Sequence, residues 1–249
     1  MLEDANDPKP DMDGVYNDPD ADLTLISSDN IAFKIYTYHL GTSPVLVDMV
    51  KSLPCSDSII SFSDPQMEDS DAIRYILNIL HNRHSLLDVD HLGIFRNTIA
   101  FVKKYEMLLL EPYLAYQLQR YLDNNGGKAR YVFILAAELD NVSIAAAAIQ
   151  KGAQGIFVQN NAKSFPDKWF TREQLNERER LKPHVRWGFV DGSWMMDPAA
   201  WPLWELRRVP FDYLSALIRT HAKFPFGQDK SDDQDAAEYF IRLMDDLKI

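Results

Sequence analysis

The chain has 249 residues, of which 46% are hydrophobic, 12% aromatic and 25% charged, a composition typical of a globular protein. The single cysteine, Cys55, excludes a disulfide within the chain and favours a reducing compartment, so we expect an intracellular protein of the cytoplasm or nucleus. No apolar run approaches the roughly 18 residues of a membrane span, and we expect no secretory signal. The sequence argues against a membrane protein and against a disulfide scaffold.

The negative charge is unevenly distributed. Basic and acidic residues number 26 and 37, for a net charge of −11. Residues 1–22 contain eight acids and one base, Lys9, so the remainder of the chain carries only −4. The most basic stretch, Arg172 to Arg186, interleaves glutamates with its arginines, which is typical of a solvated helix face. Because phosphate groups repel such a chain, we expect no direct nucleic-acid partner.

The N-terminal part predicts a tail followed by short strands. Residues 1–20 are rich in Asp, Asn and Pro and have little to bury, so we expect a disordered acidic tail. Apolar residues then alternate in residues 23–26 and 31–35, with a turn sequence over residues 28–30, and this pattern predicts a hairpin. A third β-rich run covers residues 59–62.

Helical periodicity follows, and it predicts the rest of an α+β fold. Apolar stripes over residues 73–80, 95–102 and 114–122 indicate three helices. The third begins after Pro112 and ends before Gly126-Gly127. Further helices are expected over residues 132–139, 144–149, 211–218 and 237–244, with Asn141 as an N-cap, Gly152 as a stop and Ser231 with Gln234 as a capping box. We therefore expect one α+β domain over residues 21–124 and a mainly helical C-terminal extension over residues 128–249.

Catalytic signals are few. The sequence has no phosphate-binding glycine loop and no Gly-x-Ser-x-Gly motif. Cys55 has no basic partner nearby in the sequence, and the group of His81, His84 and His91 has no cysteine or carboxylate in ligand register. We expect no catalytic, cofactor or metal site. All five tryptophans fall between residues 169 and 204, where they could form a local core or a partner surface.

Residues 20–123 resemble the BTB/POZ family, in the form abundant among basidiomycete fungi. The segment from Phe33 to Met49, FKIYTYHLGTSPVLVDM, is similar to the family's hallmark strand and helix. Residues 22–25 match its first strand, residues 59–64 and 73–80 its next strand and helix, and residues 97–107 its late helix. The resemblance implies a BTB fold, a small mixed sheet flanked by helices, with the helical C-terminal extension that such proteins carry.

The resemblance implies a protein-interaction module, a substrate-recruiting adaptor or scaffold, rather than an enzyme. A cullin scaffold is one partner that it implies, and the docking surface would include Leu46, Asp48, Met49, Tyr105, Glu106, Met107 and Leu108. The family's phenylalanine is replaced here by Leu46, which removes aromatic contact area. Many members dimerise through a swapped N-terminal helix; because residues 1–20 have no apolar stripe, we expect no such homodimer. A transcriptional or chromatin cofactor acting through partners, or an uncharacterised enzyme, are the alternatives.

Overall fold

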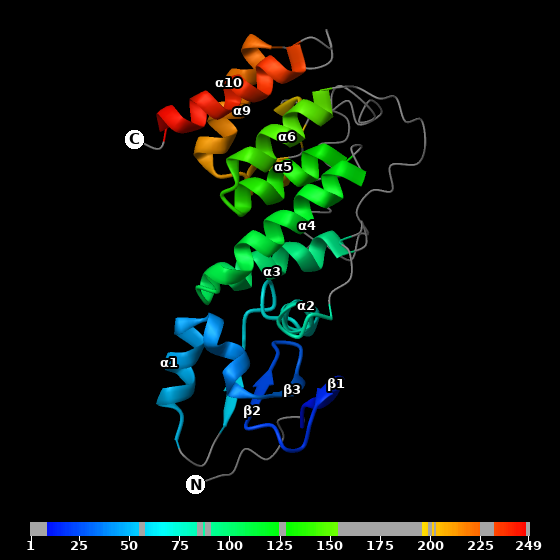
Figure 1. Cartoon of the computed structure of the whole chain (residues 1–249), viewed down its shortest axis with the longest axis vertical. Helices are drawn as coiled ribbons and strands as arrows, with labels where there is room; N and C mark the ends of the chain where they lie inside the picture. Colours follow the sequence, from blue (N-terminus) through cyan, green and yellow to red (C-terminus); the bar gives the residue numbers. More distant parts are fainter. Residues whose placement is uncertain are drawn as a thin grey trace. The chain divides into compact units, whose positions relative to one another are not determined.

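The computed structural model describes residues 9–54, 58–83, 87, 91–124, 128–153, 196–198, 201, 203–224 and 232–247. The chain forms two compact units, Met1–Leu114 (unit 1) and Ala115–Ile249 (unit 2) (Figure 1). These two units divide inside a helix, α4 (Glu111–Asn124), while the domain boundary expected from the sequence at residues 124–128 stays a prediction. The fold class is α+β, as predicted. Within the described residues, no helix combines the length and hydropathy needed to cross a membrane.

Unit 1 contains a four-stranded sheet of order β1-β3-β2-β4. The predicted hairpin is confirmed: β2 (Leu23–Ile26) and β3 (Ile31–Ile35) pair in antiparallel fashion. Asn30 in the connecting turn has a φ of 63°, a conformation that asparagine tolerates better than most residues. The predicted third strand is β4 (Ile59–Ser61), which lies parallel to β2.

The fourth strand corrects the prediction of a disordered tail. Residues Asp11–Asn17 form β1, which lies parallel to β3 at an edge of the sheet. The buried carboxylate of Asp13 accepts backbone N–H bonds from Val15 and Tyr16, both at 2.8 Å, and pairs with Arg74 at 2.7 Å. The Tyr16 hydroxyl donates to Asn78 at 2.8 Å. The amino-acid composition predicted disorder here because few residues could be buried. The buried Tyr16 ring and the Asp13 carboxylate, paired with Arg74, are enough to attach this strand to the sheet.

Short helices cover this sheet. Unit 1 contains η1 (Thr37–Thr42), α1 (Pro44–Ser52), α2 (Ser70–Leu80), α3 (Leu92–Lys104), η3 (Leu108–Leu110) and the start of α4. Asp69 begins α2 by accepting the N–H of Ala72 at 2.7 Å. Helices α2 and α3 pack together, and α1 lies beside the sheet (Figure 1). Apolar side chains of the strands and helices, Leu25, Phe33, Ile73, Leu77 and Phe95 among them, form the core.

Unit 2 is helical in its described residues. It contains the rest of α4, α5 (Ala129–Glu138), α6 (Val142–Ala153), α8 (Leu203–Leu206), α9 (Phe211–Lys223) and α10 (Asp232–Leu247). Helix α6 packs against α5 and α10, and α10 against α9 (Figure 1). The predicted N-cap is confirmed, since Asn141 accepts the N–H of Ile144 at 3.0 Å. Helix α6 ends at Ala153, one residue after the predicted stop at Gly152, where a Cβ atom would collide with the Met196 side chain.

Aromatic packing forms the centre of unit 2. The Phe133 ring contacts the rings of Trp201, Tyr213 and Phe240, with centroids 5.8, 6.5 and 5.6 Å away. The core interpretation of the tryptophans is therefore confirmed for Trp201. The rings of Trp169, Trp187, Trp194 and Trp204, and the predicted cap at Ser231, lie outside the described residues. A buried ion pair, Arg130 with Glu205 at 3.0 Å, joins α5 to α8.

Candidate interaction surface

The structure brings the two predicted docking segments together at one buried hydroxyl. The Oγ atom of Ser43 accepts the N–H of Leu46 at 3.0 Å and so caps the start of α1. The same hydroxyl donates to the backbone carbonyl of Tyr105, directly after α3. These segments are 62 residues apart in the sequence, yet one serine fixes them to each other. The N-terminus of α1 is thereby held at the C-terminus of α3.

The predicted docking residues divide into a buried and an exposed group. Leu46, Tyr105 and Met107 expose 1%, 5% and 0% of their surface, so they form part of the core and offer no contact area to a partner. Four remain accessible: Met49 is half-buried, and Asp48, Glu106 and Leu108 are exposed. Asp48 also pairs with Lys51 one turn later on α1, at 2.9 Å.

A tight turn after α3 explains why Leu108 is exposed. Glu106 adopts a φ of 52°, and the N–H of Met107 then donates to the carbonyl of Val102 at 2.8 Å. This turn directs Met107 into the core, and Leu110 is also buried. Between them Leu108 and Leu109 are 63% and 74% exposed. We call this pair the η3 ridge.

Sequence reasoning missed Leu109, the more exposed member of the η3 ridge. The available signal was the run Leu108-Leu109-Leu110, which has no helical or strand periodicity. Three consecutive apolar residues in a one-turn helix cannot all face one core. At least one had to face solvent, but the run alone did not say which.

A buried carboxylate binds the C-terminal end of α3, just before the η3 ridge. Glu68 accepts the N–H groups of Ser63 and Asp64 at 2.8 and 2.7 Å, the Tyr105 hydroxyl at 2.6 Å and the Lys104 ammonium. Burial alone would raise the pKa of Glu68, but these four donors outweigh it and lower the pKa below its ordinary value. For Tyr105, burial and the Glu68 carboxylate both raise the pKa. Glu68 is therefore ionised and Tyr105 neutral near pH 7.

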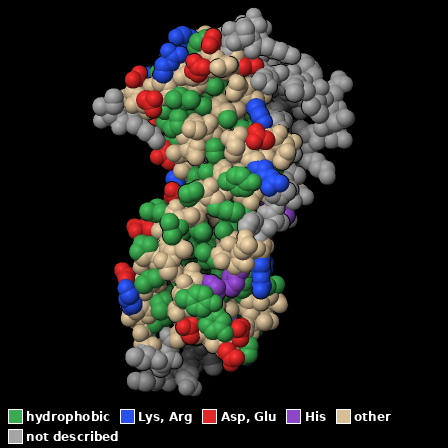
Figure 2. Space-filling model, in the orientation of Figure 1, with side chains coloured by type: hydrophobic (Ala, Val, Ile, Leu, Met, Phe, Trp, Pro, Cys, Tyr) green, Lys and Arg blue, Asp and Glu red, His purple; other side chains and the backbone are tan. Residues whose placement is uncertain are grey.

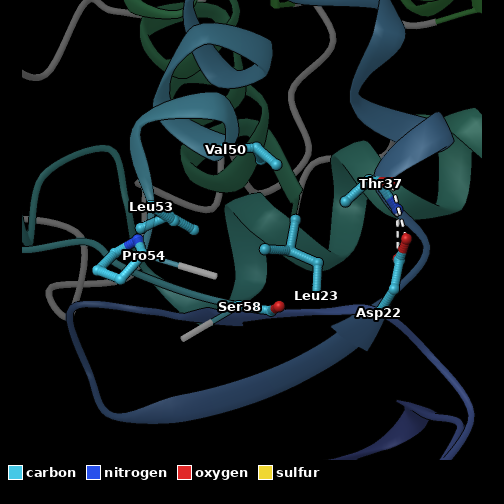
Figure 3. Close-up of a pocket in the computed structure, with 7 residues that line it drawn as sticks. All are labelled: Asp22, Leu23, Thr37, Val50, Leu53, Pro54 and Ser58. Atoms are coloured by element: carbon cyan, nitrogen blue, oxygen red, sulfur yellow. Dashed lines mark hydrogen bonds between the residues drawn. The ribbon is translucent and has the colours of Figure 1, made fainter. Parts of the chain in front are cut away.

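A small pocket lies at another part of unit 1. It has a volume of about 160 Å³ and is lined by Asp22, Leu23, Thr37, Val50, Leu53, Pro54 and Ser58. Figure 3 shows Asp22 and Thr37 at one end of the pocket and Val50, Leu53 and Pro54 at the other. The Asp22 carboxylate accepts the Thr37 N–H at 2.7 Å and the Thr37 hydroxyl at 2.8 Å. The pocket thus has one anionic end and one apolar end.

Two histidine rings, His39 of η1 and His81 at the end of α2, lie tilted against each other. The rings of His39 and His81 lie with their centroids 4.0 Å apart, and the Tyr16 ring lies 5.2 Å beyond His81. Both Nε2 atoms are buried and have no hydrogen-bond partner among the described residues. Burial lowers the pKa of both imidazoles, and His39 and Arg83 add to this effect at His81. Figure 2 shows histidine side chains on this face of unit 1, with hydrophobic and acidic side chains beside them.

The histidine motif of the sequence is only partly described. His84 and Cys55 lie outside the described residues, and His91 lies at the start of α3. In the part of the chain that the structure does describe, no three His, Cys, Asp or Glu side chains are grouped as a metal ion would require. The ring partner of His81 is His39, which the sequence analysis did not consider. That pairing joins η1 to the end of α2, a contact that no local spacing indicates.

Comparison with models of known protein families, with curated proteins and with solved structures finds no match for this chain.

Proposed function

We propose that unit 1 is a protein-interaction module of the BTB/POZ kind and that the η3 ridge is part of its docking surface. The observation that carries the proposal is the exposure of Leu108 and Leu109 on a turn whose neighbours Met107 and Leu110 are buried. Adjacent exposed apolar side chains on a rigid support, with the charged Glu106 beside them, form a surface patch of the kind that marks protein–protein contacts. Such a ridge can bury its surface on a partner with little loss of conformational entropy.

The order of elements supports the BTB part of the proposal. A strand pair, a helix, a further strand and two helices follow one another as β2, β3, α1, β4, α2 and α3, at the positions where the sequence resembles the family. An adaptor that recruits a substrate to a cullin scaffold is the specific form that the resemblance implies. Leu46 is buried, so its replacement of the family's phenylalanine alters the core beneath α1 and leaves the contact area at Asp48 and Met49 unchanged.

The proposal is tested by affinity purification of the full chain followed by mass spectrometry. The double variant Leu108→Asp with Leu109→Asp should lose the partners that the wild-type chain recovers, because two charges on the ridge oppose desolvation. Phe211→Asp is the matched control, since Phe211 is an exposed apolar residue of unit 2. Purified partners are then retested for direct binding.

Recovery of a cullin that depends on the η3 ridge would support the adaptor role. A partner set that lacks any ligase subunit but is lost with the ridge would keep the interaction module and reject the adaptor. Partners retained equally by the double variant and by the control would contradict the docking surface itself. Thermal melts of both variants show whether any loss comes from unfolding.

A further inference from the structure

We propose that the pocket between β2, η1 and α1 receives one arginine or lysine side chain of a partner protein. Its volume of about 160 Å³ is well below the roughly 300 Å³ at which pockets for small molecules begin. A single long side chain fits such a volume. The inference goes beyond the proposed function, because the pocket does not include the η3 ridge.

The lining of the pocket selects a cation on an aliphatic stem. Leu23, Val50 and Leu53 provide apolar walls, and Asp22 provides a carboxylate at one end (Figure 3). Lysine and arginine are the side chains that combine a chain of methylene groups with a positively charged head. An aliphatic side chain would leave Asp22 without a charge partner, and an acidic one would be repelled by it.

The Asp22 carboxylate is fixed in place and keeps capacity for another donor. Each of its oxygens accepts one hydrogen bond from Thr37, and a carboxylate oxygen has room for a second. Thr37 is uncharged, and among the described residues no lysine or arginine forms an ion pair with Asp22. The charge is therefore oriented by the protein but is not neutralised by it.

The surroundings add a second carboxylate, that of Asp18, on which the positive charge of Lys34 also acts. The Asp18 carboxylate accepts a hydrogen bond from the Tyr36 hydroxyl at 2.8 Å, and Tyr36 is the residue before Thr37. The turn over residues 18–21, closed by the N–H of Ala21 on the carbonyl of Asp18 at 3.2 Å, leads directly into Asp22. Two carboxylates from one turn are thus held against the start of η1. A basic segment of a partner would be attracted to this side of unit 1 before one of its side chains enters the pocket.

The test uses fluorescein-labelled peptides of the sequence Gly-Ser-X-Gly-Ser-X-Gly-Ser and the full-length chain. X is arginine, lysine, citrulline or norleucine, where the last two are neutral analogues of the first two. Fluorescence anisotropy at about 50 mM salt keeps electrostatic screening moderate. We expect the arginine or the lysine peptide to bind, and its neutral analogue to bind about tenfold more weakly.

Three variants separate the pocket from the general charge of the chain. Asp22→Asn removes the charge while its amide group can keep both hydrogen bonds to Thr37, and Val50→Phe fills the pocket while leaving the charge. Each should weaken binding of the basic peptide by about fivefold or more. The control, Asp245→Asn, removes an exposed charge of unit 2 and should change affinity by less than about twofold.

Each remaining outcome overturns the proposal. Equal weakening by Asp22→Asn and Asp245→Asn would show that only net charge attracts the peptide. Unchanged affinity in Val50→Phe would show that no side chain enters the pocket. Absence of saturable binding by either basic peptide up to about 1 mM would show that the pocket has no useful affinity for a cation. Melting temperatures within a few degrees of wild type exclude unfolding as the cause of a loss, and either pocket variant alone suffices if the other is destabilised.

Discussion

The buried carboxylate of Glu68 provides the sharpest test of how unit 1 holds its interaction surface. In Glu68→Gln the side-chain shape is kept, but one acceptor oxygen becomes an NH₂ group. That group would face two donors, either the N–H groups of Ser63 and Asp64 or the Tyr105 hydroxyl and the Lys104 ammonium. The variant therefore loses the charge and at least one of the four hydrogen bonds, because the backbone N–H groups and the Lys104 ammonium can only donate, whereas the Tyr105 hydroxyl can turn and accept from the NH₂ group.

The size of the expected loss in the free energy of unfolding depends on which of these hydrogen-bond donors are buried. A hydrogen bond to a charged group is worth about 1.5–3 kcal/mol, and removing one member of a buried charged network costs about 3–5 kcal/mol. Because the Lys104 side chain is 42% exposed, solvent screening reduces its share to at most about 1 kcal/mol. We expect the free energy of unfolding of unit 1 to fall by about 3 kcal/mol, which corresponds to a decrease in melting temperature of roughly 12 °C for a unit of this length.

The assay must report on unit 1 alone. All five tryptophans lie between residues 169 and 204 and therefore in unit 2, so tryptophan fluorescence follows the unfolding of that unit. Hydrogen exchange of the amides in β2, β3 and α2 follows unit 1. We expect Glu68→Gln to lower protection in those elements while the fluorescence transition stays in place.

Glu106→Gln is the matched control. Glu106 is also a glutamate of unit 1, but it is exposed, and its replacement should change stability by less than about 0.5 kcal/mol. Because the pKa of Glu68 is lowered in the folded state, its contribution is present above the unfolded pKa and is lost as the pH falls through the folded pKa. The stability difference between wild type and Glu68→Gln should therefore shrink below about pH 4. A loss no larger than that of Glu106→Gln would refute the reasoning.

Three further predictions concern other contacts. Asp13→Asn removes the charge that anchors β1 to Arg74, and proteolysis within residues 11–22 should accelerate by about tenfold or more. In the wild type, the unfolding free energy should fall between pH 7 and pH 5, because the unfolded state binds protons that the half-buried imidazoles of His39 and His81 do not. His39→Phe should flatten this dependence in denaturation curves. Gly152→Ala should lower the free energy of unfolding of unit 2 by about 1–3 kcal/mol, because the added Cβ atom would collide with the Met196 side chain. Gly41→Ala, where the added atom meets open space, should leave the melting temperature unchanged in the same melts.

The elements predicted correctly are those whose signal is local. The hairpin from Leu23 to Ile35 shows alternation on both sides of a turn sequence, and the cap at Asn141 precedes a clear apolar stripe. Strand β1 had neither signal. Its two buried residues, Asp13 and Tyr16, are three apart, a spacing that does not match the period of two of a regular strand. Its stability depends on Arg74 and Asn78, about 60 residues away.

At the candidate surface, the exposure of individual residues was the property that the sequence did not predict. The resemblance implied a surface that includes residues 46–49 and 105–108, and the hydrogen bond from Ser43 to Tyr105 holds these two segments close together. It did not distinguish supporting residues from exposed ones, because burial at Leu46 and Met107 depends on a positive φ at Glu106 and on the packing of α3. A motif can predict which element a residue belongs to, whereas the exposure of its side chain depends on how the elements pack together.

This division decides which substitutions can test docking at all. Truncating Leu46 or Tyr105 would open a cavity in the core and cost about 2–5 kcal/mol, so any partner lost with such a variant would report on folding. Replacing Leu108 or Leu109 should change the free energy of unfolding little, because most of the surface of both side chains stays exposed to water in the folded state. A change at the η3 ridge therefore affects association with little effect on stability. For the same reason Asp22→Asn, which can keep both bonds to Thr37, tests the pocket more cleanly than truncation of its apolar walls would.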